Sequence, residues 1–189
     1  SRPSRALFQS AFRCYHFGLL KKGSMSQALT VLTKHTEDPS VFDVFWASGL
    51  HTQGVITVSV AGLLEDKDLV AELYATQHLL EVLEVCSKDR TGNSLTITCS
   101  LGAVRKLASG RSSKDHLAPF ALFLRTRFVD AEIAISKSDS FIRPIAHSNR
   151  SQIHVASARP SSVALPTGEL AGVTAHALEQ FRIRFSFAR

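Results

Sequence analysis

The chain has 189 residues, a formal net charge of +6 and a hydrophobic content of 44%, with a pI near 9.5. That length supports one domain with a sizeable core, and that hydrophobic content excludes a disordered polycation. No apolar run approaches the roughly twenty residues needed to cross a bilayer, and the three cysteines lack the spacing of a disulfide framework or a zinc site. We therefore expect a soluble intracellular protein with no membrane partner and with nucleic acid as the leading class of partner.

The first 36 residues contain no acidic residue. The first 26 of them contain five basic residues, Arg2, Arg5, Arg13, Lys21 and Lys22. Aromatic residues stand among them, and this mixture suits phosphate contacts and base stacking, although such aromatics also pack on a domain's own core. An acid-free start rich in Arg and Ser is also typical of a transit peptide. We expect residues 1–26 to form an ordered basic N-terminal extension.

Three short runs of β-branched and aromatic residues follow the extension. They are residues 28–33 (ALTVLT), 41–47 (VFDVFWA) and 55–63 (VITVSVAGL). Residues that favour turns separate the runs, so the sequence predicts three strands joined as an antiparallel meander.

Residues 67–85 (KDLVAELYATQHLLEVLEV) show the periodicity of an amphipathic helix. Its apolar face is formed by Leu69, Leu73, Thr76, Leu80 and Leu83. Glu72 falls on this same face, three residues after Leu69 and four before Thr76. An unpaired ionised carboxylate in a core costs several kcal/mol, so such a glutamate usually has a partner, a metal or a raised pKa. The alternative is that Glu72 lies at an exposed first turn, where the helix dipole favours an acid.

Two further strands are expected after this helix. Residues 95–99 (LTITC) and 128–136 (FVDAEIAIS) alternate apolar with polar side chains, and residues 102–109 and 116–125 are predicted as short helices between them. Strands reached through helical crossovers normally add in parallel. The predicted fold is therefore α/β, with a five-stranded mixed sheet flanked by helices.

The last part of the chain is less regular. Residues 138–166 are polar and are expected to form a loop or a weak helix. Thr174 is a candidate cap for a helix over residues 174–185 with an apolar stripe rich in phenylalanine. We divide the chain into the extension, a central domain over residues 27–160 and a C-terminal extension over residues 161–189.

Part of the chain, residues 28–158, resembles the ribonuclease H family in strand order and local sequence. The best match is VAELYATQHLLEVLE (70–84), which is similar to the family's first helix with its opening Ala-Glu-Leu. The resemblance implies a ribonuclease-H-like fold and gives Glu72 the place of the catalytic glutamate. A second match, ITCSLGAVRKLASG (97–110), is similar to the fourth strand and the helix after it. A third joins the FVDAEIAIS strand to His147 and Asn149, where the family has a His-containing loop and an Asn-Glu pair.

The chemistry of that family depends on several carboxylates, which hold two divalent cations roughly 4 Å apart on the phosphodiester. This chain departs from the pattern at three places. The first strand ends in Thr33, Lys34 and His35 instead of an aspartate, Cys99-Ser100 replaces Asp-Ser, and the final helix position falls near Ile153 or His154. Of the family's acids, only Glu72 is present. The candidates to substitute for the others are Asp43, Asp130 and Asp139, which are otherwise ordinary solvated acids.

Other motifs offer little chemistry. No nucleophile elbow, Gly-rich phosphate loop or His-Glu-x-x-His sequence is present. Cys99 is either a reactive thiol at a strand end or an inert core residue. A basic tract contains His147, His154, Arg143, Arg150 and Arg159, which either contact phosphates or line a solvated loop.

Three hypotheses follow. The leading one is a non-catalytic ribonuclease-H-like domain with a degenerate site and no cofactor, which binds nucleic acid or docks in a nucleic-acid-handling assembly. Its candidate binding residues are Arg2, Arg5, Arg13, Lys21, Lys22, Arg143, Arg150 and Arg159. The second is a Mg²⁺-dependent ribonuclease H-type nuclease that uses Glu72 as a catalytic residue with substitute carboxylates. The third is a protein-interaction or homo-oligomerisation module built from the N-terminal extension and the C-terminal helix.

Overall fold

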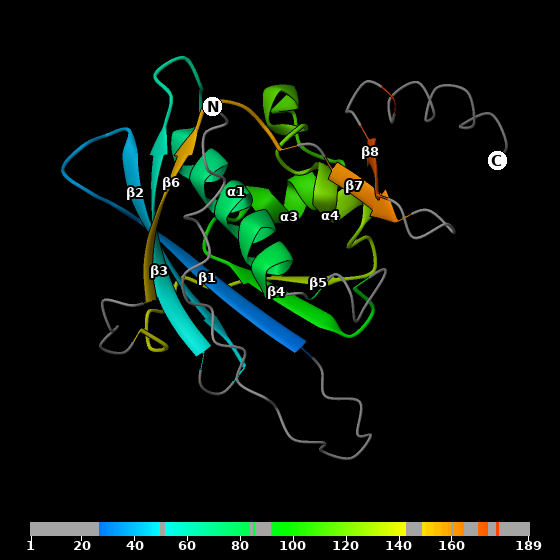
Figure 1. Cartoon of the computed structure of the whole chain (residues 1–189), viewed down its shortest axis with the longest axis horizontal. Helices are drawn as coiled ribbons and strands as arrows, with labels where there is room; N and C mark the ends of the chain where they lie inside the picture. Colours follow the sequence, from blue (N-terminus) through cyan, green and yellow to red (C-terminus); the bar gives the residue numbers. More distant parts are fainter. Residues whose placement is uncertain are drawn as a thin grey trace, which may run out of the picture.

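The computed structural model describes residues 27–49, 52–83, 85, 92–142, 149–159, 161–164, 170–173 and 177. Within these ranges, a six-stranded mixed sheet has the strand order β5-β4-β1-β2-β3-β6 (Figure 1). Its strands are β1 (Gln27–His35), β2 (Val41–Ser48), β3 (Thr52–Val60), β4 (Leu95–Cys99), β5 (Glu132–Ile135) and β6 (Arg150–Val155). The first three strands pair antiparallel. β4 pairs in parallel with β1, β5 pairs in parallel with β4, and β6 pairs in parallel with β3.

The predicted mixed α/β sheet is confirmed, with one strand more than expected. The predicted strand 95–99 has the bounds of β4, and the predicted meander is β1–β3. The extra strand, β6, lies where a loop or weak helix was predicted, so that prediction was wrong. Residues 150–155 contain only Ile153 and Val155 as apolar side chains, which is too weak a pattern to reveal a strand without its neighbour β3.

The long helix α1 (Lys67–Val82) lies across one face of the sheet and contacts β1, β2 and β3 (Figure 1). Val31 of β1, Val44 of β2 and Ile56 of β3 are almost completely buried beneath it. They share a face because paired residues of neighbouring strands point to the same side of a sheet. Leu73 is fully buried on the helix side of this layer, as its periodicity predicted. The helix stops three residues earlier than expected.

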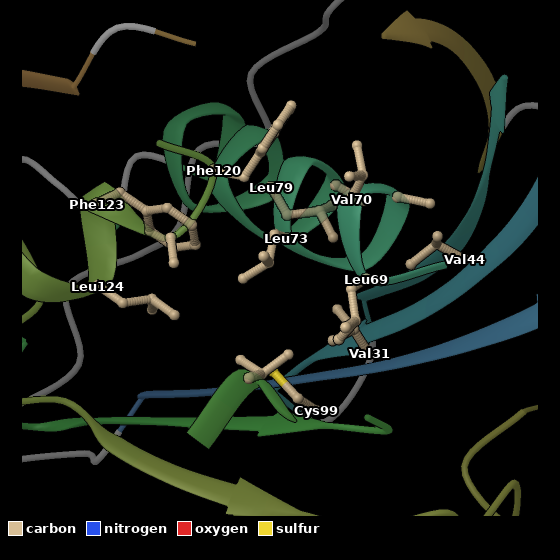
Figure 2. Close-up of a cluster of buried hydrophobic side chains, with 14 of the residues drawn as sticks. Val31, Val44, Leu69, Val70, Leu73, Leu79, Cys99, Phe120, Phe123 and Leu124 are labelled. Carbon is tan, nitrogen blue, oxygen red and sulfur yellow. The ribbon is translucent and has the colours of Figure 1, made fainter. Parts of the chain in front are cut away.

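The smaller elements close the core at one end. They are α3 (Ala103–Ala108), the 3₁₀ helix η1 (Asp115–Leu117), α4 (Leu122–Thr126), and the paired strands β7 (Ser161–Ala164) and β8 (Leu170–Val173). Phe120, Phe123 and Leu124 pack toward α1 (Figure 2). The single helix predicted for residues 116–125 is thus two short turns, η1 and α4.

Several expectations concern residues outside the described ranges. These are the N-terminal extension 1–26 and the predicted C-terminal helix 174–185, of which Ala177 alone is described. In the part of the chain that is described, no helix is both long enough and apolar enough to span a membrane.

Candidate functional site

Glu72 lies where three elements meet: α1, the end of β1, and the turn that follows β4. Its side chain is 0% exposed, so the alternative of an exposed acid at the helix start was wrong. The carboxylate reaches this junction because Glu72 is on the helix face that carries Leu69 and Leu73, both buried against the sheet.

Four hydrogen bonds converge on the Glu72 carboxylate. Oε1 accepts the backbone N–H groups of Ser100 and Leu101, each at 2.9 Å. Oε2 accepts the hydroxyl of Thr33, with Oγ1 at 2.6 Å, and also the hydroxyl of Ser100. The Thr33 N–H in turn donates to Ser100 Oγ at 3.1 Å. The result is a closed network in which each carboxylate oxygen has two donors.

The backbone explains why these donors meet the carboxylate. Thr33 lies on β1 two residues after Val31, so strand alternation points both side chains toward α1. Ser100 comes directly after the last residue of β4, where the chain turns toward α3. Buried N–H groups that leave a sheet need another acceptor, and Glu72 provides it for Ser100 and Leu101.

Two opposing effects act on the ionisation of Glu72. Burial raises the pKa of the carboxyl group, because a charge in a poorly solvated place is unfavourable. The hydrogen bonds from Ser100, Thr33 and the Leu101 N–H favour the ionised form and oppose this rise. Burial is the larger effect, and the net pKa is above the ordinary value.

No group of three or more His, Cys, Asp or Glu side chains that could hold a metal ion exists among the described residues. The proposed substitute acids do not join Glu72. Asp43 lies opposite Lys34 in the register of β1 and β2, so its side chain is on the sheet face opposite Thr33. It accepts a hydrogen bond from the Thr57 hydroxyl at 2.7 Å. Asp139 forms an exposed ion pair with Lys34, with 3.3 Å between Nζ and Oδ2. Asp130 is exposed in the turn before β5. The position near Ile153 and His154 is part of β6 and not of a helix.

Cys99 occupies the place of an acid in the resembled family but points into the apolar core. It is completely buried, among side chains of α1 and the sheet (Figure 2). Burial, together with the nearby Glu72 carboxylate, raises the pKa of the thiol well above its ordinary range. The complete burial and the raised pKa both indicate that Cys99 is an inert core residue and not a reactive thiol.

The candidate nucleic-acid-binding residues have different surroundings. Arg150 is exposed at the start of β6. Arg159 is engaged within the chain, because its Nη1 lies 2.6 Å from Glu81 Oε2 and its guanidinium lies 4.9 Å from the centre of the Tyr74 ring. The remaining candidates lie outside the described residues; they are Arg2, Arg5, Arg13, Lys21, Lys22 and Arg143.

Sequence reasoning missed two parts of this picture. The first is the pair of hydroxyl donors, Thr33 and Ser100, which the sequence placed at strand ends beside the positions of the family's acids but did not identify as partners of Glu72. The second is a group of exposed basic residues on α3 and α4, for which the run Arg105-Lys106 was a visible signal.

Comparison with known proteins gives only weak structural similarity. No protein-family model matches the chain, and no curated protein matches it significantly. Among solved structures, the chain is similar to ribonuclease H1 from the halophilic archaeon Halobacterium salinarum NRC-1, with a TM-score of 0.39 and 14% sequence identity over 69% of this chain and 85% of that chain. A likeness this weak carries no functional inference. The mixed sheet is instead assigned from the strand order and pairing described above.

Proposed function

We propose that this chain is a non-catalytic, ribonuclease-H-like domain that binds nucleic acid. The observation that carries the non-catalytic part is the saturation of the Glu72 carboxylate by four hydrogen-bond donors. A carboxylate that ligates a metal must direct its oxygens at the cation. Here those oxygens are directed at the protein's own hydroxyl and amide groups.

The local charges also disfavour a cation. The N–H groups of Ser100 and Leu101 point their positive ends at the carboxylate. A Mg²⁺ ion bound to Oε1 would have to displace these donors, which would then face the ion with the wrong polarity. Two-metal chemistry requires several acids around two ions, and Glu72 has no second acid in the described network.

The nucleic-acid part of the proposal is supported by charge. The N-terminal extension contributes five basic residues and no acid, and so supplies most of the net charge of +6. Lysine and arginine neutralise phosphates and release condensed counterions, which gives affinity with little reading of base sequence. The expected ligand is therefore the phosphate backbone of RNA or DNA.

Binding is tested by fluorescence anisotropy of labelled single-stranded RNA, single-stranded DNA and duplex DNA across a salt series. Replacing the five basic residues of the extension by glutamine should make the affinity less sensitive to salt. The slope of log affinity against log salt concentration should shrink by about 0.9 for each duplex phosphate that is no longer neutralised. A matched variant with each Arg exchanged for Lys, and each Lys for Arg, should keep the slope. If the intact chain binds none of these ligands more tightly than about 10⁻⁴ M at physiological salt, the weak end of non-specific binding, the protein-interaction hypothesis replaces this one.

Catalysis is tested separately with an RNA/DNA hybrid in Mg²⁺ or Mn²⁺. We expect no metal-dependent hydrolysis. Hydrolysis that disappears in a Glu72→Gln variant would refute the degenerate site and establish the nuclease alternative.

A further inference from the structure

The short helix α3 ends in a tight turn closed by backbone hydrogen bonds. The Gly110 N–H donates to Leu107 O at 3.1 Å, and the Arg111 N–H donates to Lys106 O at 2.9 Å. Gly110 has a φ of 67°, a left-handed conformation that glycine adopts without strain. This turn brings Arg111 back beside the last turn of α3.

Arg125 reaches the same turn from α4. A Cβ atom placed on Gly110 would lie 3.5 Å from Arg125 Nη2, so the guanidinium group lies beside this glycine. The helices α3 and α4 contact each other and lie side by side (Figure 1). The contact therefore brings the Arg125 guanidinium group close to the end of α3, whose exposed residues are also basic. The members of this group, which we call the α3–α4 basic patch, are Arg105, Lys106, Arg111 and Arg125.

All four side chains are exposed, and none forms an ion pair with an acid in the described ranges. Three other described Lys and Arg side chains do form ion pairs: Lys34 with Asp139, Lys114 with Asp66, and Arg159 with Glu81. Basic residues in the last turn of a helix also complement its dipole, which accounts for Arg105 and Lys106. It does not account for Arg111 and Arg125, which add like charge to the same surface without a compensating acid.

We infer that the α3–α4 basic patch binds the phosphate backbone of nucleic acid. This inference rests on the proposed function and adds to it a contact surface formed by residues of the central domain. Three of the four side chains are arginine, whose planar guanidinium group can bind phosphate oxygens through two parallel hydrogen bonds. Like charges gathered on one exposed surface repel one another, and a polyanion removes that repulsion.

The test uses the full-length chain and labelled duplex DNA in a salt series. A patch variant carries R105Q, K106Q, R111Q and R125Q, and its charge-matched control carries R105K, K106R, R111K and R125K. The patch variant should bind at least about tenfold more weakly at physiological salt, with a slope reduced by about 0.9 for each phosphate that the patch no longer neutralises. The control should keep the slope, and circular dichroism with thermal melting should show that both variants are folded.

The outcomes separate this inference from the proposed function. If the intact chain does not bind, the proposed function fails and the patch fails with it. If the intact chain binds and the patch variant keeps its affinity and slope, the patch is overturned while nucleic-acid binding stands. If the fourfold variant does not fold, R111Q alone, at an exposed residue outside the helices, should still lower the slope, and an unchanged slope overturns the inference.

Discussion

Removing the Glu72 carboxylate should separate its structural role from its charge. A Glu72→Ala variant leaves two N–H groups without their acceptor, one on the buried Ser100 and one on the half-buried Leu101. Each such group costs about 1–3 kcal/mol, so the variant should lose about 2–6 kcal/mol of unfolding free energy. The hydroxyls of Thr33 and Ser100 add little to this loss, because a hydroxyl can rotate toward another acceptor.

A Glu72→Gln variant keeps the shape and can keep the network. The amide oxygen replaces Oε1 and accepts the two backbone N–H groups, which cannot reverse. The amide nitrogen replaces Oε2 and donates to the hydroxyls of Thr33 and Ser100, which can act as acceptors. Neutral hydrogen bonds are weaker than charge-assisted ones, so we expect a loss of only about 1 kcal/mol.

The assay is denaturant unfolding at fixed pH, with Glu65→Ala as the control because Glu65 is an exposed acid in the loop before α1. The reasoning fails if Glu72→Ala loses no more stability than Glu72→Gln or the control. That result would mean the two N–H groups do not depend on the carboxylate.

The pH dependence gives a second readout from the same proteins. Because the folded-state pKa of Glu72 lies above the ordinary value of 4.5, the folded protein holds a proton that the unfolded chain has already released. The contribution of Glu72 to stability is therefore greatest below the unfolded pKa and declines as pH rises through the folded pKa. This component should vanish in Glu72→Gln.

Two further residues give simpler predictions. The Cys99 thiol should resist alkylation in the folded protein and react only on unfolding, because it is completely buried and burial raises its pKa; peptide mass spectrometry measures this, and rapid labelling under native conditions would contradict it. Arg159→Ala should lower stability by about 1 kcal/mol because it removes the Glu81 ion pair and the packing on Tyr74, both partly exposed. If Arg159→Ala instead weakens nucleic-acid binding without changing the unfolding midpoint, its main role is at the phosphate.

The elements that the sequence predicted well are those whose side-chain pattern is local. β4 alternates Leu95, Ile97 and Cys99 with two threonines, and all three are buried on the α1 side. β6 has no such pattern. Residues 150–155 form a strand because they pair with the edge of β3. This pairing joins distant parts of the chain, so the local side-chain pattern of residues 150–155 does not reveal it.

The site divides in the same way. Helical periodicity placed Glu72 on an apolar face, which needs only its neighbours along α1. Its partners lie 39 residues before it, at Thr33, and 28 residues after it, at Ser100. They meet it only because β1 and β4 pair in parallel, from Gln27 opposite Leu95 to Thr30 opposite Thr98. Local pattern thus placed an acid on an apolar helix face and left its burial open, while the identity of its partners depended on strand register.

The two proposals therefore depend on different parts of the molecule. Glu72 acts inward, through hydrogen bonds to β1 and to the turn after β4, and its removal should appear as a change in unfolding free energy. The α3–α4 basic patch acts outward through exposed cations that have no described ion-pair partner, so its removal should appear in the salt dependence of binding. Glu72 and the patch residues share no described hydrogen bond or ion pair. Substitutions at the two places should therefore change the free energy of unfolding by amounts that are close to additive. Under the two proposals, the surface of the domain binds a polyanion while the acid at its centre holds the sheet and α1 together.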